Sequence, residues 1–312
     1  MTTALITHPA CREHDPGRGH PESPARLETI LRAFDGPEFQ TLVRLEAPKA
    51  GREPLERAHH AALVETILGP LDKQARRDGF ASIDPDTAMS PGSAEAALRA
   101  AGAACLAVDE VAAGKISNAF CAVRPPGHHA ERGSAMGFCL FNNVAVGAYH
   151  ARTRGFHRIA IVDFDVHHGN GTQDIFWDDA DALYISTHQM PLYPGTGSSK
   201  ERGAHGNIVN LPLPPDAGGR ELRGAFEARA LPALEEFRAD FLFISAGFDA
   251  HASDPLANLA FTEEDFGWAT RALCSYAARA CGARVVSTLE GGYDLAALAR
   301  SASAHVRALM EF

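Results

Sequence analysis

Short apolar runs alternate along the chain with longer segments of helical pattern. Several of the runs are continuously apolar instead of alternating with polar residues, which is typical of strands that helices cover on both faces, as in parallel sheets. Their Val, Ile and aromatic content also favours strands. The predicted strands are 4–7, 119–123, 158–164, 182–187, 207–211, 240–245 and 283–289.

One long Ala-rich helix is predicted over 93–113. Ser90 followed by Pro91 is a suitable N-cap and first-turn pair, and Gly114 is a suitable terminator. Apolar residues occur on all sides of this segment, so we expect a buried helix.

The remaining pattern predicts a single domain. Thr262 with Asp265 resembles a capping box that opens a helix toward Arg279. The alternation of strands and helices predicts one doubly wound α/β domain over 1–312, without repeats or linkers. The Pro- and Gly-rich segment 191–219 is predicted to form long surface loops.

Composition narrows the class of protein. The 312 residues are 46% hydrophobic and 22% charged, and the formal net charge is −10. This acidic balance argues against direct nucleic-acid binding, which needs a positive surface. The N-terminal stretch lacks a basic signal-peptide region and no apolar run is long enough to span a membrane, so we expect a cytoplasmic protein without membrane contact. Free thiols in a reducing compartment are expected, because no CxxC pair occurs among Cys11, Cys105, Cys121, Cys139, Cys274 and Cys281.

Four polar clusters stand at the ends of predicted strands. "RPPGHHA" (124–130) follows the strand at 119–123, and "DFDVHHGNG" (163–171) ends the strand at 158–164. "SAGFDAH" (245–251) and "LEGGYD" (289–294) end two later strands. Sites in open α/β sheets form beyond the carboxyl ends of the strands, so the four clusters predict one composite site.

The second cluster has the composition of half a metal site. Burying carboxylates is costly unless they are paired or bind a metal. Asp163, Asp165 and His167 are each two positions apart, so on extended backbone they point the same way. With Asp249 from a distant strand end, Asp165 and His167 provide three oxygen and nitrogen ligands, which leaves a position open as in a catalytic zinc site. The alternative is that Asp165 and His167 only cap a helix that starts near Gly169.

The other clusters contain acid–base groups. His128 and His129 follow the stiff Pro-Pro-Gly of 125–127, which suits a general base near a metal, although a surface histidine pair is the alternative. Tyr293 follows two glycines and is a candidate oxyanion donor, or simply a packed side chain after a turn. The "GNGT" of 169–172 lacks the lysine and spacing of a phosphate-binding loop.

Together, in this order and spacing, "RPPGHHA", "DFDVHHGNGTQ", "SAGFDAH…DP" and "LEGGYD" resemble the histone deacetylase superfamily. This zinc-dependent group also contains acetylpolyamine and acetoin-utilisation amidohydrolases. "GHPESPAR" (19–26) and "DPDTAMSPGS" (84–93) match further family segments, so the resemblance runs from about His8 to the C-terminus. The "GNGTQ" and "LEGGY" variants are more similar to the class II and bacterial branch than to class I.

The resemblance implies an arginase-like α/β fold, with a mostly parallel central sheet of about eight strands. It also implies one catalytic Zn²⁺ held by Asp165, His167 and Asp249, although oxygen and nitrogen ligands also admit Fe²⁺ or Co²⁺. A zinc-activated water would attack the amide carbonyl. By the same resemblance, His129 would be the general base, His128 the electrostatic partner and acid, and Tyr293 the oxyanion donor. Asp163 would be the hydrogen-bond partner of His128, and Asn170 that of His129.

Further roles follow from the resemblance alone. A substrate tunnel for a lysine-like chain is expected, and Tyr193 departs from the family there because a phenylalanine is the common wall residue. Arg26 would line an inner channel for acetate release. The implied tunnel residues are Phe138, Tyr193, Gly127, Gly292 and Leu256, and the implied structural K⁺ would be held around Asp163, Asp165, His167, Ser186 and Thr187.

The leading hypothesis is a deacetylase or deacylase acting on acylated lysine in a peptide or protein, or on a related acylated amine. An acetylpolyamine amidohydrolase is the main alternative, but polyamine-preferring relatives place an acidic residue where this chain has Leu256. A non-catalytic acyl-lysine binding protein is expected to have lost a ligand, a histidine or the tyrosine, and none is missing. A two-metal ureohydrolase needs more metal-binding groups near His128 and His129. The substrate, acyl length and oligomeric state stay open.

Overall fold

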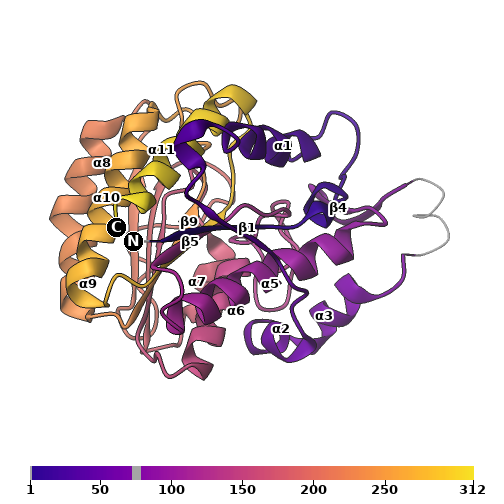
Figure 1. Cartoon of the computed structure of the whole chain (residues 1–312), viewed down its shortest axis with the longest axis horizontal. Coiled ribbons are helices and arrows are strands. Elements are labelled where there is room, and N and C mark those ends of the chain that lie inside the picture. The colour runs from indigo at the N-terminus through magenta and orange to yellow at the C-terminus, as the bar shows by residue number, and fades with distance from the viewer. Residues whose placement is uncertain (1, 72–78) are drawn as a thin grey trace.

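A parallel eight-stranded sheet forms the centre of the molecule, as seen in a computed structural model that describes residues 2–71 and 79–312 (Figure 1). The strand order is β2-β1-β5-β10-β9-β6-β7-β8, and every neighbouring pair is parallel. The strands are β1 (Thr3–Thr7), β2 (Val43–Glu46), β5 (Asn118–Cys121), β6 (Ile159–Asp163), β7 (Ala182–Gln189), β8 (Ile208–Leu213), β9 (Phe241–Ala246) and β10 (Val285–Leu289).

Helices cover both faces of the sheet (Figure 1). On one face α11 packs against α1 and α10, and on the other α5 packs against α6, which also contacts α2 and α7. The α/β architecture with eight strands is therefore as expected. The helices are α1 (Pro24–Ala33), α2 (Arg52–Ala58), α3 (Ala61–Leu68), α5 (Ser93–Ala112), α6 (Asn143–Thr153), α7 (Asn170–Phe176), α8 (Gly219–Ala225), α9 (Leu231–Phe237), α10 (Glu263–Ala280) and α11 (Leu295–Met310).

The inner strands are buried along their whole length. Every residue of β5, β6, β9 and β10 is buried, which explains why these segments are mostly apolar. All seven predicted strands form within two residues of the expected bounds. The edge strand β2 was not predicted, because its sequence "VRLE" is mostly exposed and charged. The small hairpin of β3 (Ala81–Asp84) and β4 (Thr87–Met89) was not predicted either.

One local prediction needs correction. The helix α5 begins at Ser93 after Gly92, so Ser90 is not its N-cap. The Ser90 hydroxyl instead donates to the Glu13 carbonyl and accepts from the Asp15 backbone N–H, which ties the N-terminal segment to this turn. Within the segment 191–219, β8 is the strand predicted at 207–211, and residues 191–207 and 214–218 lie outside helices and strands, as expected of loops.

Other local predictions are confirmed. Gly114 follows the end of α5 with φ of 67°, and the capping box of Thr262 and Asp265 opens α10. All six cysteines are unpaired and buried. Within residues 2–71 and 79–312, no helix is both long and apolar enough to cross a membrane.

Candidate active site

The four polar clusters meet at one edge of the sheet, because β5, β10, β9 and β6 are consecutive in the strand order. Their registers keep the strand ends level. Thr288 of β10 lies beside Cys121 of β5 and beside Ser245 of β9, and Ser245 lies beside Asp163 of β6. The side chains that follow these four strands therefore converge at one place above the middle of the sheet.

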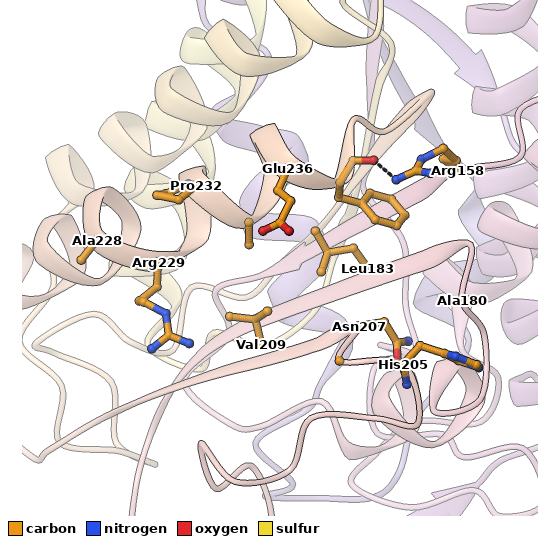
Figure 2. A pocket seen from close by; sticks show the side chains of 13 residues that line it. Arg158, Ala180, Leu183, His205, Asn207, Val209, Ala228, Arg229, Pro232 and Glu236 are labelled. Carbon is orange, nitrogen blue, oxygen red and sulfur yellow. Dashed lines mark hydrogen bonds between the residues drawn. The ribbon is translucent and has the colours of Figure 1, made fainter.

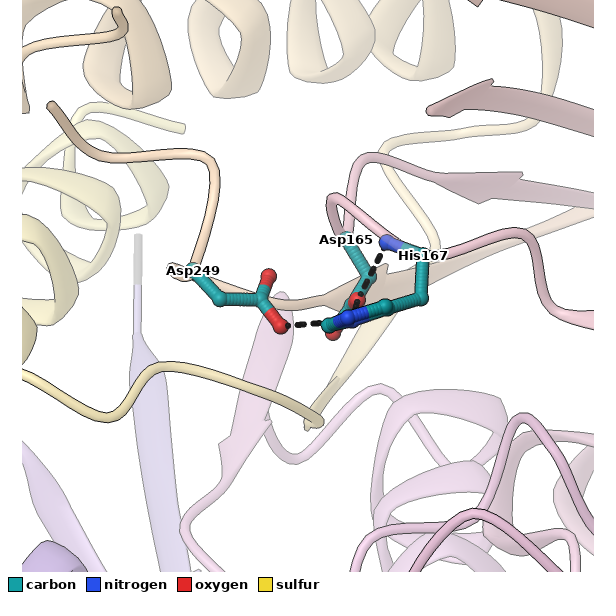
Figure 3. A group of neighbouring side chains, drawn as sticks. All are labelled: Asp165, His167 and Asp249. Atoms are coloured by element: carbon teal, nitrogen blue, oxygen red, sulfur yellow. Dashed lines mark hydrogen bonds and ion pairs between the residues drawn. The ribbon is translucent and has the colours of Figure 1, made fainter. Parts of the chain in front are cut away.

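Asp165, His167 and Asp249 form a compact, buried group (Figure 3). One potential ligand atom from each lies within 4.8 Å of the others. The Nδ1 atom of His167 is 3.2 Å from Asp165 Oδ1 and 3.1 Å from Asp249 Oδ2. The backbone holds the two carboxylates, because Gly291 N–H donates to Asp165 Oδ2 and Val166 N–H donates to Asp249 Oδ1.

This group has the properties of a cation site. The helix α7 begins at Asn170 with Gly169 as its N-cap, so the alternative that Asp165 and His167 cap it is wrong. Burial, with the nearby Asp165 charge, raises the pKa of Asp249 to about 7. A divalent cation would relieve this cost, and the oxygen and nitrogen donors suit Zn²⁺ or Fe²⁺.

The glycine of "EGG" that faces the group has no room for a side chain. A Cβ atom on Gly291 would lie 2.1 Å from Asp249 Oδ2 and 2.6 Å from Asp165 Oδ2. The backbone after β10 can approach the two carboxylates this closely only because position 291 is glycine.

The two histidines of "GHH" lie beside the group, with ring centroids 4.0 Å apart. His128 Nδ1 is 3.0 Å from Asp163 Oδ2, which also accepts a hydrogen bond from the Tyr184 hydroxyl. Burial acts to lower the pKa of His128, but the charges of Asp165 and Asp163 outweigh it and raise the pKa to about 10. His128 is therefore built to carry a positive charge.

His129 has a different hydrogen-bond partner, and its pKa is shifted in the opposite direction. Its Nδ1 is 2.7 Å from Asn170 Oδ1. Burial and then the neighbouring His128 and His167 hold the pKa of His129 well below its usual range. The Asn170 amide is oriented by its Nδ2, which donates to Glu131 Oε1 at 2.8 Å. The amide oxygen therefore faces His129, so Nδ1 carries the proton and Nε2 is left with a lone pair.

Tyr293 closes the site from the loop after β10. Burial raises the pKa of its phenol well above the usual range, although the Arg26 charge opposes this, so the hydroxyl stays protonated and can donate. The Arg26 guanidinium lies 4.9 Å from the ring centroid. Arg26 is fully buried and donates to the carbonyls of Glu290 and Gly292, on either side of Gly291.

A cavity of about 200 Å³ reaches these groups. Its walls are mostly apolar and aromatic, and polar groups of His129, His167 and Tyr293 lie along it. Phe138 holds a left-handed φ of 67°, and its N–H donates to the Thr87 hydroxyl at 3.0 Å. The other lining residues are Asp86, Gly137, Phe138, Leu192, Tyr193 and Leu256.

Comparison with known proteins decides the family. The model of the histone deacetylase domain matches residues 20–309. The chain belongs to the histone deacetylase family. A crystal structure of the HDA15 HD domain superposes with a TM-score of 0.92 at 34% identity, and the match covers 99% of this chain and 88% of that one.

Named relatives extend across several kingdoms. A probable deacetylase of Archaeoglobus fulgidus is 39% identical over 95% of this chain and 82% of its own length. A histone deacetylase-like amidohydrolase of Pseudomonas aeruginosa is 39% identical, covering 88% of this chain and 73% of the relative. Histone deacetylase 14, chloroplastic, of Arabidopsis thaliana is 40% identical over 93% of this chain and 73% of its own. Membership of the histone deacetylase family places this chain among hydrolases of the deacetylase and amidohydrolase type.

Some residues expected in the substrate tunnel of a histone deacetylase lie elsewhere. Gly127 and Gly292 do not line the cavity: Gly127 N–H donates to Glu290 Oε2, and the Gly292 carbonyl accepts from Arg26.

Ser186 and Thr187, which were expected at the K⁺ site, are buried in β7, and the Thr187 hydroxyl is 3.5 Å from the Asp163 carbonyl. These residues surround the site without facing the cavity.

Sequence reasoning missed several residues of this site. Glu290 is fully buried and accepts from the N–H groups of Gly127 and His128, which fixes the start of the histidine loop. Asp86 supplies a carboxylate to the cavity lining. Both lie inside stretches that were noted as motifs, "LEGGYD" and "DPDTAMSPGS", but their roles depend on loop geometry that the sequence does not display.

A second, larger hollow of about 500 Å³ lies at the opposite ends of the strands, before β7 and β8 (Figure 2). Arg158 there is engaged with the Phe237 carbonyl, and Arg229 shares the lining with Glu236. No group of three metal-ligating side chains occurs there among the described residues. The candidate metal ligands Asp165, His167 and Asp249 lie at the other end of the sheet.

Proposed function

We propose that this chain is a metal-dependent deacylase, which hydrolyses the amide of an acetylated or short-chain acylated lysine side chain. The observation that carries the proposal is the narrow cavity whose lining joins the apolar walls of Phe138, Tyr193 and Leu256 to His129, His167 and Tyr293. Such a cavity suits a methylene chain ending in a small amide. Family membership supports amide hydrolysis, and the substrate is our inference.

Asp165, His167 and Asp249 would hold one divalent ion, for which Zn²⁺ is our proposal. When bound, the ion supplies polarisation of the substrate carbonyl and acidification of a water. A structural K⁺ near Asp163, Asp165, His167, Ser186 and Thr187 remains a prediction, supported only by the buried position of these residues between β6 and β7.

The proton transfers fall to the two histidines. His129 keeps a free Nε2 because Asn170 binds its Nδ1, so it can take a proton from the attacking water. His128, paired with Asp163, stabilises the developing negative charge as a cation and can return a proton to the leaving amine. Different partners thus divide the base and acid roles between adjacent rings.

Tyr293 would donate its hydroxyl hydrogen bond to the oxyanion that forms from the amide carbonyl. Its raised pKa keeps the phenol protonated for this purpose. Arg26 fixes the backbone just before Tyr293, through the carbonyls of Glu290 and Gly292. Its role in an acetate channel remains a prediction from the resemblance.

An acylated polyamine is a second candidate substrate. Leu256 makes one wall apolar, but Asp86 places a carboxylate in the same cavity, where it could attract a second ammonium group. A cytoplasmic location and the absence of nucleic-acid partners remain predictions.

The test is turnover by the purified, zinc-reconstituted protein. Acetyl-lysine peptides, longer acyl-lysine peptides and acetylpolyamines would be compared by kcat/KM. We expect turnover of at least the acetyl-lysine peptides. Tight binding of these peptides without turnover would instead support a non-catalytic acyl-lysine binding protein. If the protein neither binds nor turns over any acylated amine, the proposal is contradicted.

A further inference from the structure

The backbone before Tyr293 has little conformational preference of its own. Tyr293 follows two glycines, and Gly292 has φ of 120°, a conformation that other residues rarely adopt. The phenol hydroxyl has no hydrogen-bond partner among the residues that the structure describes. A proton donor must be held within a fraction of an ångström of its working position, so something other than its own side chain must hold it.

Asp254 makes the contacts that do this. Its Oδ2 accepts hydrogen bonds from Tyr293 N–H at 2.7 Å and from Asp294 N–H at 3.3 Å. Its Oδ1 accepts from Leu256 N–H at 3.0 Å. The residue is 8% exposed, and hydrogen bonds from backbone N–H groups to a buried carboxylate are stronger than those to a neutral acceptor.

One carboxylate therefore joins two loops that line the cavity. Leu256 belongs to the loop after β9, and Tyr293 to the loop after β10. Arg26 and Asp165 anchor the same second loop before the tyrosine, through Glu290, Gly291 and Gly292. Asp254 is the anchor at Tyr293 itself.

We propose that Asp254 is a positioning residue, which sets the Tyr293 phenol against the reacting carbonyl and holds the Leu256 wall at the matching distance. This inference rests on the proposed deacylase function, because it assigns Tyr293 the role of oxyanion donor. Asp254 neither touches the substrate nor exchanges a proton with it. It acts only through the backbone of the two loops.

The substitution Asp254→Asn tests this role with a side chain of the same shape. An amide has one oxygen, so its NH₂ group must face either Leu256 N–H or the N–H groups of Tyr293 and Asp294. One of the two loops then loses its anchor and faces a donor. We expect kcat on an acetyl-lysine peptide to fall by about tenfold, whereas a trifluoroacetyl-lysine peptide, whose carbonyl needs less polarisation, should be affected less.

A double-mutant cycle with Tyr293→Phe separates positioning from general damage. If Asp254 acts through the phenol, Asp254→Asn in the Tyr293→Phe background should lower kcat by less than about twofold. A merely structural role would lower kcat equally in both backgrounds. Asp240→Asn is the matched control, because Asp240 Oδ2 also accepts two consecutive backbone N–H groups, those of His157 and Arg158, but at the far end of the sheet. It should leave kcat unchanged.

The outcomes can be told apart. If Tyr293→Phe itself has no effect, the proposed function loses its oxyanion donor. If Tyr293→Phe lowers kcat but Asp254→Asn has the same effect in both backgrounds, only the positioning role is overturned. Should Asp254→Asn fail to fold, Asp254→Glu keeps the charge and moves it by one methylene. The same cycle with Asp254→Glu then supports or overturns the positioning role by the same comparison of backgrounds.

Discussion

His129 Nδ1 lies 2.7 Å from the amide oxygen of Asn170, whereas the neighbouring His128 Nδ1 lies 3.0 Å from the carboxylate of Asp163. The two rings are adjacent and both buried, but they differ in their hydrogen-bond partners and in the charged groups around them. A carboxylate favours the imidazolium and an amide does so far less. The charges of Asp165 and Asp163 raise the pKa of His128 to about 10, whereas burial and the neighbouring His128 and His167 hold the pKa of His129 low.

The first prediction concerns Asn170→Asp. A carboxylate beside His129 should raise its pKa, so the acidic limb of the kcat/KM profile should move to higher pH and activity below that limb should fall. Glu131 lies 2.8 Å from the present amide nitrogen and would repel the new charge, so the measurement is made in Asn170→Asp with Glu131→Gln and in Glu131→Gln alone. A limb that stays in place, or moves to lower pH, would show that Asn170 does not tune His129.

The second prediction concerns Tyr293→Phe. This change removes one hydroxyl from the cavity wall, so folding and substrate binding should change little. Loss of one oxyanion donor should lower kcat by about 10²-fold or more. The loss should be smaller for trifluoroacetyl amides. Steady-state kinetics on an acetyl-lysine peptide provide the measurement, and a decrease of less than about threefold would remove Tyr293 from the mechanism.

Sequence alone could predict the content of the site better than its arrangement. The four clusters were identifiable because polar residues gather where mostly apolar strands end, as Asp163 does at the end of β6. The strand order was not readable. β5 precedes β6 in the chain with no other strand of the sheet between them, yet β10 and β9 separate the two in space, and that depends on how the crossover helices pack.

The residues that sequence reasoning missed act mainly through the backbone. Glu290 accepts from the histidine loop and Asp254 from the tyrosine loop, and such contacts depend on the path of a loop, not on residue spacing. Gly127 and Gly292 show the converse. Both belong to recognisable motifs, but their place is behind the cavity wall, where they permit close packing or accept a hydrogen bond.

The third prediction concerns the metal. One divalent ion per chain is expected, and Asp249→Ala should abolish activity and lower the metal content measured by elemental analysis. Adding Zn²⁺ should raise the melting temperature of the unsubstituted protein, because a ligand that binds only the folded state stabilises it. Asp249→Ala should lose this shift, whereas Asp240→Ala, at the other end of the sheet, should keep it. Full activity in a preparation verified to be metal-free would contradict the proposed site.

The last prediction concerns substrate choice at Leu256, which lines the cavity together with Asp86. Leu256→Glu adds a second carboxylate to this wall. A charge pair near the surface is worth about 1 kcal/mol or more, so the ratio of kcat/KM for acetylpolyamines over acetyl-lysine peptides should rise by about fivefold. Leu256→Gln is the matched control, since it has nearly the same shape without the charge and should leave the ratio near its original value. The increase should shrink at high salt, because partly exposed charges are screened. An unchanged ratio in Leu256→Glu would mean that other parts of the cavity, such as the segment 84–93 that contains Asp86, determine which amine is accepted.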